Sequence, residues 1–436
     1  MNNVNLSTTI TSASLHDTEE GMRAKITKAV EYYNAENIQE TLNLVLNDKD
    51  LLKSSYVHVL IGNCYRKQNK IDSALKSWQK AVEINEKEYN AYINIANVQF
   101  VQGDAAQAIE NWTKAFSIQP ENPVVCLNLA IAYNQKGCRI KSTKFFERYL
   151  RYNRNNMTRE YLSVKESMLR LRTKVDYYFK KLAALKNTGN LKLMATINLK
   201  MISIYADLPT VYNNLGQIFM FTKDYDKALD FFLTVYKNFP YSPLVLWNIA
   251  TIFERKGKKD WAYCFYKRCS DMMPKTSQKA KVITEKANSL VFKVKTKENS
   301  DIHLKEAKDF EAKNLYEDAL VEYENAYLLS PDELADVEHK IQVLKTYIQP
   351  EPFVIADLYS RINNAMNNNL LKQCVEMCDR IILLAESNSK ESSYALKCKT
   401  ECKRILATRG RIHPISFEMI TVAISESAMT KARFGL

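Results

Sequence analysis

Two pairs of cysteines have a spacing that could build a metal site. Cys374 and Cys378 are four residues apart, as are Cys398 and Cys402. Residues four apart share one face of a helix, so two such helices facing each other would bring four thiolates together as zinc ligands. Zinc motifs usually place two residues between their cysteines, however, and free cysteine is a common core residue. We therefore predict that these four side chains belong to the core and bind no metal, with a zinc site or redox pair as the alternative.

The histidines offer no further chemistry. None of them stands at ligand or triad spacing from a cysteine, an aspartate or a second histidine; they are His16, His58, His303, His339 and His413. The chain also lacks a P-loop, a dinucleotide-binding fingerprint and a G-x-S-x-G motif. Catalytic residues concentrate on loops, and a chain with 9 glycines in 436 residues has little loop to offer. We predict no enzymatic activity and no cofactor.

Composition indicates a folded helical protein. The hydrophobic fraction is 46% and the charged fraction 25%, as in globular domains. The scarcity of glycine and of proline, of which there are 10, excludes collagen-like chains and argues against turn-rich sandwiches and barrels. No apolar stretch of about 18 residues predicts a transmembrane helix, and the N-terminus lacks the pattern of a signal peptide. Nine cysteines, an odd number, favour a reducing compartment, and we predict a cytoplasmic location.

The sequence repeats itself every 34 residues, and this period determines the elements that must position any site. Six stretches follow the pattern: 55–88, 89–122, 123–156, 209–242, 243–276 and 300–333. The eighth residue is small, as at Gly62, Ala96 and Gly216, and so is the twentieth. The twenty-fourth is aromatic, as at Trp78 and Trp112. Small residues let two antiparallel helices approach closely, large ones fill the space between them, and a proline at position thirty-two ends the second helix.

At these positions the chain resembles the tetratricopeptide-repeat family. The resemblance is strong over the six stretches and weak at about 22–54, 175–208 and 355–388. It implies an all-α fold, a right-handed superhelical solenoid of helix pairs, because one pair cannot bury its apolar face alone. It also implies a protein-binding role.

Interruptions of the period predict the domain plan. We expect a disordered segment at 1–21, a first repeat array at 22–156, an inserted basic helix segment at 157–174 and a central array with a following helix at 175–299. A third array with a capping helix should occupy 300–410, followed by a tail at 411–436 that is either flexible or a docking segment. Apolar residues spaced three and four apart from Tyr161 to Leu185 predict one long helix over 158–187.

In the resembled family the first helix of each pair lines a concave groove, and its sixth residue lies beside the groove. That residue is asparagine in four repeats: Asn94, Asn128, Asn214 and Asn248. An amide offers both the donor and the acceptor that a peptide backbone needs. These residues resemble the asparagine ladder of the O-linked N-acetylglucosamine transferase repeats. The remaining predicted groove residues are Asn63, Asn97, Phe100 and Trp247. The alternative is that the amides are merely solvated and that the apolar residues are buried by curvature.

The net charge of +13 is concentrated in one segment. Residues 136–200 contain seventeen Lys and Arg against four Asp and Glu, which equals the excess of the whole chain. The predicted long helix is therefore apolar on one side and basic on the other, its basic residues including Arg159, Lys165, Arg170, Arg172, Lys174, Lys180 and Lys181. We interpret this face as a docking surface for an acidic protein or for a second copy. The alternatives are a solvated face and binding to nucleic acid or an anionic membrane, although no nucleic-acid-binding motif accompanies the charge.

Repeat 300–333 has the opposite charge, with ten acidic residues against three lysines, and could pair with a basic segment within or between chains. The sequence thus predicts a scaffold that holds an extended peptide in its groove and docks a second partner on its basic helix. Two alternatives stay open: a structural component of a larger secretion, motility or trafficking assembly, held by its convex face and termini, or an accessory module of a transferase.

Overall fold

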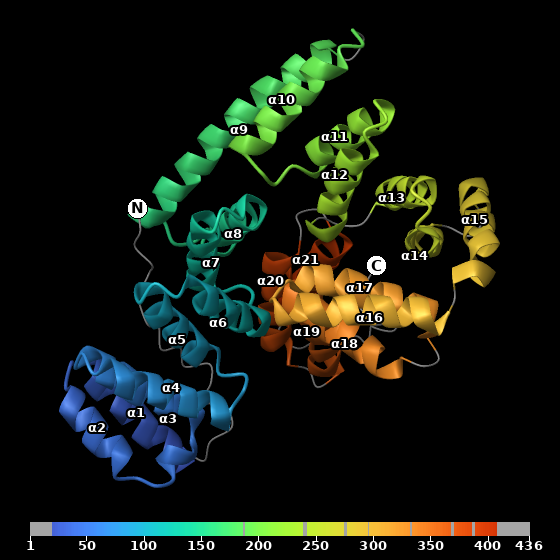
Figure 1. Cartoon of the computed structure of the whole chain (residues 1–436). Coiled ribbons are helices and arrows are strands. Elements are labelled where there is room, and N and C mark those ends of the chain that lie inside the picture. Colours follow the sequence, from blue (N-terminus) through green and yellow to red (C-terminus); the bar gives the residue numbers. More distant parts are fainter. Residues whose placement is uncertain are drawn as a thin grey trace. The chain divides into compact units, whose positions relative to one another are not determined.

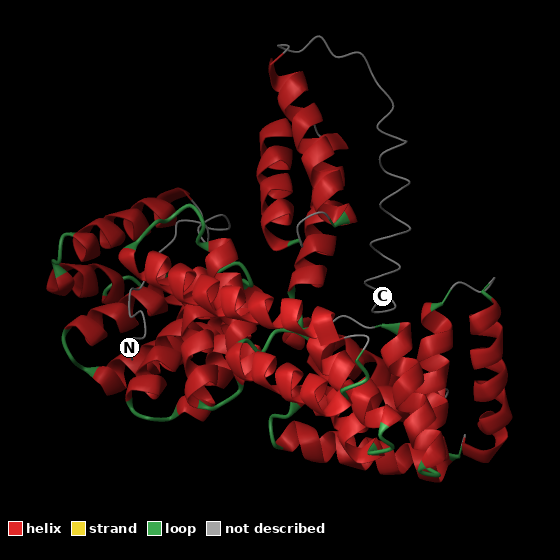
Figure 2. Cartoon of the chain, turned by 90° about the horizontal axis from the view of Figure 1, so that it is seen from above, coloured by secondary structure: helices red, strands yellow, loops and turns green. Residues whose placement is uncertain are grey.

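The computed structural model describes residues 20–407, except 186–187, 239–241, 274–276, 295, 332–333, 368–369 and 386–388. The predicted tail at 411–436 and most of the predicted disordered segment at 1–21 lie outside this range. Secondary structure in the described range is helical throughout, without a strand (Figure 2), so the predicted all-α class is confirmed. None of the described helices combines the length and the apolar character needed to cross a membrane.

The chain divides into two units, which are coloured along the sequence in Figure 1. The first unit comprises the residues up to Met157 together with Asp379–Ala395. Its N-terminal part consists of a 3-10 helix, η2 (Leu51–Lys53), and eight helices: α1 (Glu20–Asn34), α2 (Ile38–Leu46), α3 (Ser55–Lys67), α4 (Ile71–Ile84), α5 (Tyr89–Val101), α6 (Ala105–Ile118), α7 (Pro123–Gln135) and α8 (Arg139–Tyr152).

The second unit comprises Thr158–Cys378 and the residues from Leu396 onward. It contains α9 (Arg159–Leu185), α10 (Leu191–Ile204), α11 (Pro209–Phe221), α12 (Tyr225–Asn238), α13 (Pro243–Arg255), α14 (Lys259–Met272), α15 (Gln278–Val294), α16 (Lys297–Ala312), α17 (Tyr316–Leu329), α18 (Ala335–Ile348) and α19 (Glu351–Asn367). Two further helices, α20 (Leu371–Leu384) and α21 (Lys390–Ala407), complete the chain, and the limits of the units fall within them.

The turn inside the described helix pairs repeats one backbone conformation along the chain. The fifteenth residue of every repeat for which it is described has a positive φ, and only some of these residues are glycine. They are Glu36 (63°), Asn69 (60°), Gly103 (92°), Gly137 (77°), Gly189 (67°), Lys223 (63°), Gly257 (76°) and Asn314 (57°). The series includes the weakly matching repeats at 22–54 and 175–208. The turn conformation of the repeat is therefore kept in the backbone where the side chains depart from the pattern.

Close approach of paired helices follows from the small residues that the repeat pattern predicts. Gly62 on α3 lies directly under the Trp78 indole of α4, and Gly216 on α11 lies under the Phe232 ring of α12. A Cβ at Gly216 would lie 2.7 Å from Phe232 Cε1, closer than a methyl group can approach. Both aromatic side chains are fully buried. Each pair is thus a small residue fitted under a large one, as the spacing predicts.

The predicted long helix is α9, which runs without interruption through the domain limit expected near residue 174. It packs beside α10 (Figure 1). The four residues seven apart on its seam are buried, with exposed fractions of 3–8%: Tyr161, Met168, Val175 and Leu182. The chain itself therefore covers these four positions, whereas the alternate seam residues are half-buried: Val164, Leu171, Tyr178 and Leu185. Dimerisation through this helix stays a prediction.

Substituting Gly216 by alanine should destabilise the repeat despite the higher helix propensity of alanine. The added methyl group overpacks the contact with Phe232, at a cost of roughly 1–3 kcal/mol. Urea denaturation followed by circular dichroism should show a lower midpoint for Gly216→Ala. The matched control is Gly21→Ala on α1, where nothing lies within 4 Å of the new Cβ and the midpoint should not fall. An unchanged midpoint in Gly216→Ala would contradict the close-approach account.

Candidate functional site

Asparagines in the first unit form the same hydrogen-bonded arrangement at two successive repeats. Asn63 Oδ1 accepts hydrogen bonds from Trp78 Nε1 at 3.2 Å and from Asn94 Nδ2 at 2.8 Å. One period later, Asn97 Oδ1 accepts from Trp112 Nε1 at 3.1 Å and from Asn128 Nδ2 at 3.0 Å. Each oxygen thus joins the two helices of its own pair and links that pair to the next.

These amides lie in the interior and not on an open groove. Asn63, Asn94, Asn97 and Asn128 are 0–3% exposed, and Asn248 in the second unit is 8% exposed. The expected presentation of these five amides to solvent needs correction. Asn63 and Asn97 supply the acceptor that a buried tryptophan N–H requires, and Asn94 and Asn128 donate to those two oxygens. Their role in holding a peptide stays a prediction. Asn214 is half-buried.

The two aromatic residues predicted for the groove are also half-buried. The Phe100 ring lies 5.3 Å from that of Trp112, and the Trp247 ring lies 5.4 Å from that of Tyr266. The Lys286 ammonium stands 5.2 Å from the centre of the Trp247 ring. Among the predicted groove residues, then, Asn214, Phe100 and Trp247 keep partial access to solvent.

The outer face of α9 combines exposed apolar and basic side chains. Leu162, Leu169 and Tyr177 are 50%, 62% and 63% exposed. All seven predicted docking residues are exposed as well: Arg159, Lys165, Arg170, Arg172, Lys174, Lys180 and Lys181. Arg170 pairs with Glu166 at 2.6 Å, and Arg172 Nε donates to the Tyr205 hydroxyl at 3.2 Å. We call Leu162, Leu169, Tyr177 and these seven basic residues the α9 outer face.

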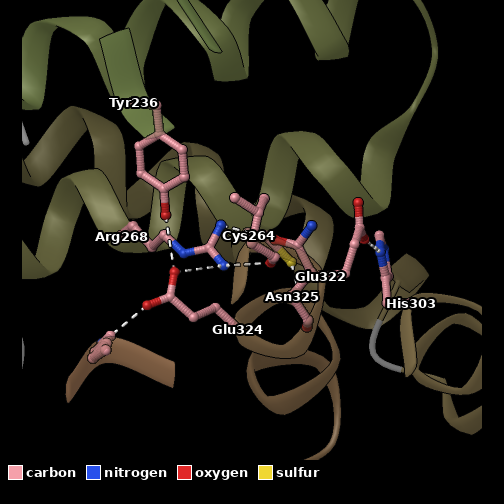
Figure 3. Close-up of polar contacts among 9 residues, drawn as sticks. Tyr236, Cys264, Arg268, His303, Glu322, Glu324 and Asn325 are labelled. Atoms are coloured by element: carbon pink, nitrogen blue, oxygen red, sulfur yellow. Dashed lines mark hydrogen bonds and ion pairs between the residues drawn. The ribbon is translucent and has the colours of Figure 1, made fainter. Parts of the chain in front are cut away.

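The acidic repeat on α16 and α17 neutralises cations of its own unit. Glu324 on α17 is surrounded by three donors from three other helices (Figure 3). Its carboxylate accepts a hydrogen bond from the Tyr236 hydroxyl at 2.9 Å and forms ion pairs with Arg268 at 3.5 Å and Lys345 at 2.9 Å. Arg268 Nη1 also donates to Asn325 Oδ1 at 2.8 Å. Burial by itself raises the pKa of Glu324, but Lys345 and Arg268 outweigh it and hold that pKa below its ordinary value.

Further ion pairs extend this neutralisation. Asp318 pairs with Lys237 on α12, and Glu311 pairs with Lys340 on α18. The acidic repeat thus meets basic side chains of α12, α14 and α18. The sequence predicts an excess of negative charge here but not these partners, which come from helices of other repeats.

His303 on α16 lies among three carboxylates in a cluster that sequence reasoning missed. The side chain is 1% exposed. Its Nδ1 lies 2.7 Å from Glu322 Oε2 on α17, and its Nε2 lies 3.5 Å from Asp260 Oδ2 on α14, which is too long for a well-formed hydrogen bond. Burial lowers the pKa of His303, but Asp260 and Glu322 together raise it to about 9. Glu306, one turn along α16, has a raised pKa because of burial and the neighbouring Glu322 charge.

The four C-terminal cysteines are buried free thiols. Cys374 and Cys402 share one hydrophobic cluster with Ala365. Among the described residues, no three of the four sulfurs lie within 4.8 Å of one another, so they do not form a tetrahedral set. Burial raises the pKa of the Cys402 thiol to about 12, which opposes formation of the thiolate that binds metals.

Comparison with known proteins identifies the repeats. A family model described as "TPR repeat" matches residues 62–103, and one described as "Tetratricopeptide repeat" matches residues 209–240. The chain is 25% identical over 212 residues to a TPR repeat-containing protein, MJ1428, of Methanocaldococcus jannaschii, covering 46% of this chain and 35% of that one. It is 28% identical over 104 residues to the human protein O-mannosyl-transferase TMTC1, covering 23% of this chain and 12% of that one.

Likeness to solved structures is weaker. The TPR domain of P58(IPK) has 13% sequence identity and a TM-score of 0.33, with 82% of this chain and 99% of that chain covered. The chain spans about a third of the length of MJ1428 and about an eighth of that of TMTC1.

Removing the Glu324 charge should destabilise the second unit. Glu324→Gln leaves Arg268 and Lys345 without a carboxylate in a largely buried place, and we expect a loss of roughly 2–4 kcal/mol. The control is Asp301→Asn, an exposed carboxylate of the same repeat. Thermal unfolding at neutral pH should separate the two variants.

The difference in stability between the wild type and Glu324→Gln should depend on pH in a defined way. Because the folded-state pKa of Glu324 is depressed, its contribution is present above the ordinary value of 4.5 and is lost as the pH falls through the lower folded value. The difference between the wild type and Glu324→Gln should therefore shrink on acidification. A difference that grew below pH 4.5 would show that the carboxylate is not the stabilising species.

Proposed function

This chain is a tetratricopeptide-repeat protein, and we propose that it is a protein-interaction scaffold with two docking surfaces. One is the outer face of α9, for an acidic helical surface of a partner protein. The other is the groove side of α11 and α13, for an extended peptide segment. The observation that carries the proposal is the composition of the α9 outer face.

Three large apolar side chains on α9 are 50–63% exposed, and seven exposed cations lie on the same helix. Burying Leu162, Leu169 and Tyr177 against a partner would recover about 25 cal/mol for each Å² of apolar surface covered. The cations at the rim would favour acidic partners and speed their encounter. A merely solvated helix face would account for the charged side chains but not for the exposed leucines. The exposed leucines therefore favour the docking interpretation over the solvated one.

The proposed peptide groove is supported by the side chains on α11 and α13 that stay partly exposed to solvent. Asn214 on α11 can offer an amide donor and acceptor to a peptide backbone, and Trp247 on α13 can offer an apolar surface one repeat further on. In the first unit the corresponding amides hold neighbouring helices together. We therefore place the peptide on the second unit, beside α11 and α13.

We propose a binding role without catalysis, since the repeat family generally supplies interaction surfaces. The likeness to TMTC1 covers 12% of that transferase, so its activity is not transferred to this chain. We also propose a reducing, cytoplasmic setting, in keeping with nine free cysteines of which eight are buried. The alternative role, as a building block of a larger assembly held by other surfaces, predicts that both docking surfaces can be altered without loss of assembly.

Charge reversal on α9 should weaken the binding of an acidic helical partner. We suggest a designed amphipathic peptide with a leucine stripe and glutamates beside it, compared with a twin carrying lysines at the glutamate positions. The combined change Lys165→Glu, Lys174→Glu and Lys181→Glu should lower affinity for the acidic peptide at least tenfold at about 0.1 M salt, where charges act over about 10 Å. Fluorescence anisotropy at several salt concentrations measures this effect.

The matched control reverses three lysine charges outside α9, so that the net charge changes by the same amount. The substituted residues are the exposed Lys76, Lys279 and Lys281. This variant should leave the affinity within about twofold, since these residues are not on α9 and take no part in the proposed docking face. Equal losses in the two triple variants would show a general charge effect and contradict a local docking face, as would equal binding of the basic twin.

Peptide binding in the groove predicts that a different set of substitutions lowers the affinity. Peptides that bind the wild type should first be selected from an array of unstructured sequences. The double change Asn214→Ala and Trp247→Ala should then reduce their affinity at least tenfold, because it removes one amide pair and one apolar contact. The α9 charge variant should bind these peptides normally. Retention of full affinity by the double variant would remove the groove proposal and leave the α9 proposal intact.

A further inference from the structure

We propose that His303, Glu306 and Glu322 form a binding site for a divalent transition-metal ion, with zinc as the best match. The ligand atoms of these three residues lie within 4.8 Å of one another, at the junction of α16 and α17. This is the one such group in the part of the chain that the structure describes. The site belongs to the second unit and is independent of both proposed docking surfaces.

The buried histidine is the first reason to expect a ligand. His303 is 1% exposed, and its Nε2 has no hydrogen-bond partner in the described structure. A buried polar nitrogen without a hydrogen bond is costly, and such groups in native proteins usually have an explanation. The imidazole is held in place by the edge of the Trp261 ring, whose centre lies 5.3 Å from its own. It is therefore an ordered nitrogen ligand in a place shielded from water.

Charge balance is the second reason. One imidazole stands among three carboxylates: Glu322 at 2.7 Å, Asp260 at 3.5 Å and Glu306 within the ligand group. Even when the imidazole is protonated and Lys258 is counted, the three carboxylates exceed the positive charges by one. Lys258 belongs in this count because the attraction of its positive charge acts against the rise in the pKa of Glu306. A divalent cation would supply the missing positive charge at the point where the carboxylates converge.

Zinc matches the donor set. It binds imidazole nitrogen and carboxylate oxygen, and three protein ligands leave a fourth position open. His303 Nδ1 faces Glu322, so we assign this nitrogen as the ligand. The unpartnered Nε2 then carries the ring proton and faces Asp260 at 3.5 Å, and a small shift of the ring on metal binding would close this outer-shell hydrogen bond. Two tetrahedral zinc ligands lie about 3.3 Å apart, so Glu322 must withdraw by roughly half an ångström from its 2.7 Å contact. Glu306 is exposed, which puts the open position on the solvent side.

The experiment uses the full chain, depleted of metal with a chelator and titrated with Co²⁺ at pH 8. Cobalt reports its ligands: nitrogen and oxygen ligands give visible bands alone, whereas bound thiolates add a charge-transfer band in the ultraviolet. We expect one equivalent of Co²⁺ to bind with visible bands only, and Zn²⁺ to displace it. This readout distinguishes the site from the nine cysteines.

The decisive variant is Glu306→Gln, with Asp309→Asn as its control. Both residues are exposed on α16, three positions apart, so neither change should impair folding. Glu306→Gln should weaken Co²⁺ at least tenfold and abolish the rise in melting temperature that Zn²⁺ gives the wild type, whereas Asp309→Asn should behave as the wild type. In metal-free protein, Glu306→Gln should melt no lower than the wild type, because it removes a repulsive charge.

Three results would overturn the proposal. They are failure of the wild type to bind Co²⁺, thiolate charge-transfer bands as the main signal, and equal affinity in Glu306→Gln and the wild type. The cluster would then be an ion pair of His303 with Glu322 and Asp260 and nothing more.

Discussion

The close approach of two antiparallel helices is the constraint on which the rest of this structure depends. Gly62 under Trp78 and Gly216 under Phe232 leave no room for a methyl group, and the alanines at the other small positions are fully buried. Helices held this close must join through a tight turn. The backbone reaches that turn by a positive φ at the fifteenth residue of every repeat in which the structure describes it, even where the residue is Glu36 or Lys223.

The same packing decides which polar groups are available for function. A tryptophan pushed into the gap between two helices needs an acceptor for its indole N–H, and Asn63 and Asn97 provide it. Carboxylates brought inside by the acidic repeat need cations, and Arg268 and Lys345 supply them. The groups that sequence patterns suggest for binding are thus partly used by the fold itself. What remains on the outside of α9 is a surface of exposed apolar and basic side chains, of which Arg170 and Arg172 also contact Glu166 and Tyr205.

The sequence predicts much of the fold because its signals are local and periodic. The repeat length, the helix pairs and the long α9 all follow from spacing along the chain. The burial of Asn94 and Asn128 does not, because a repeat position assigns a residue to a helix face but not the depth to which neighbouring pairs cover that face. His303 and Glu306 are three apart on one helix, a signal that sequence reasoning could have used. Glu322 and Asp260 come from two other helices, and only the three-dimensional packing brings them to the ring.

Hydrogen–deuterium exchange of the full chain, with and without an acidic amphipathic helical peptide, tests the central claim most directly. If the interior is committed to stacking and the α9 outer face binds partners, the peptide should slow exchange in α9 and α10. The first helices of the N-terminal repeats, α3, α5 and α7, should exchange as before. Protection confined to those three helices, with none in α9, would contradict the account.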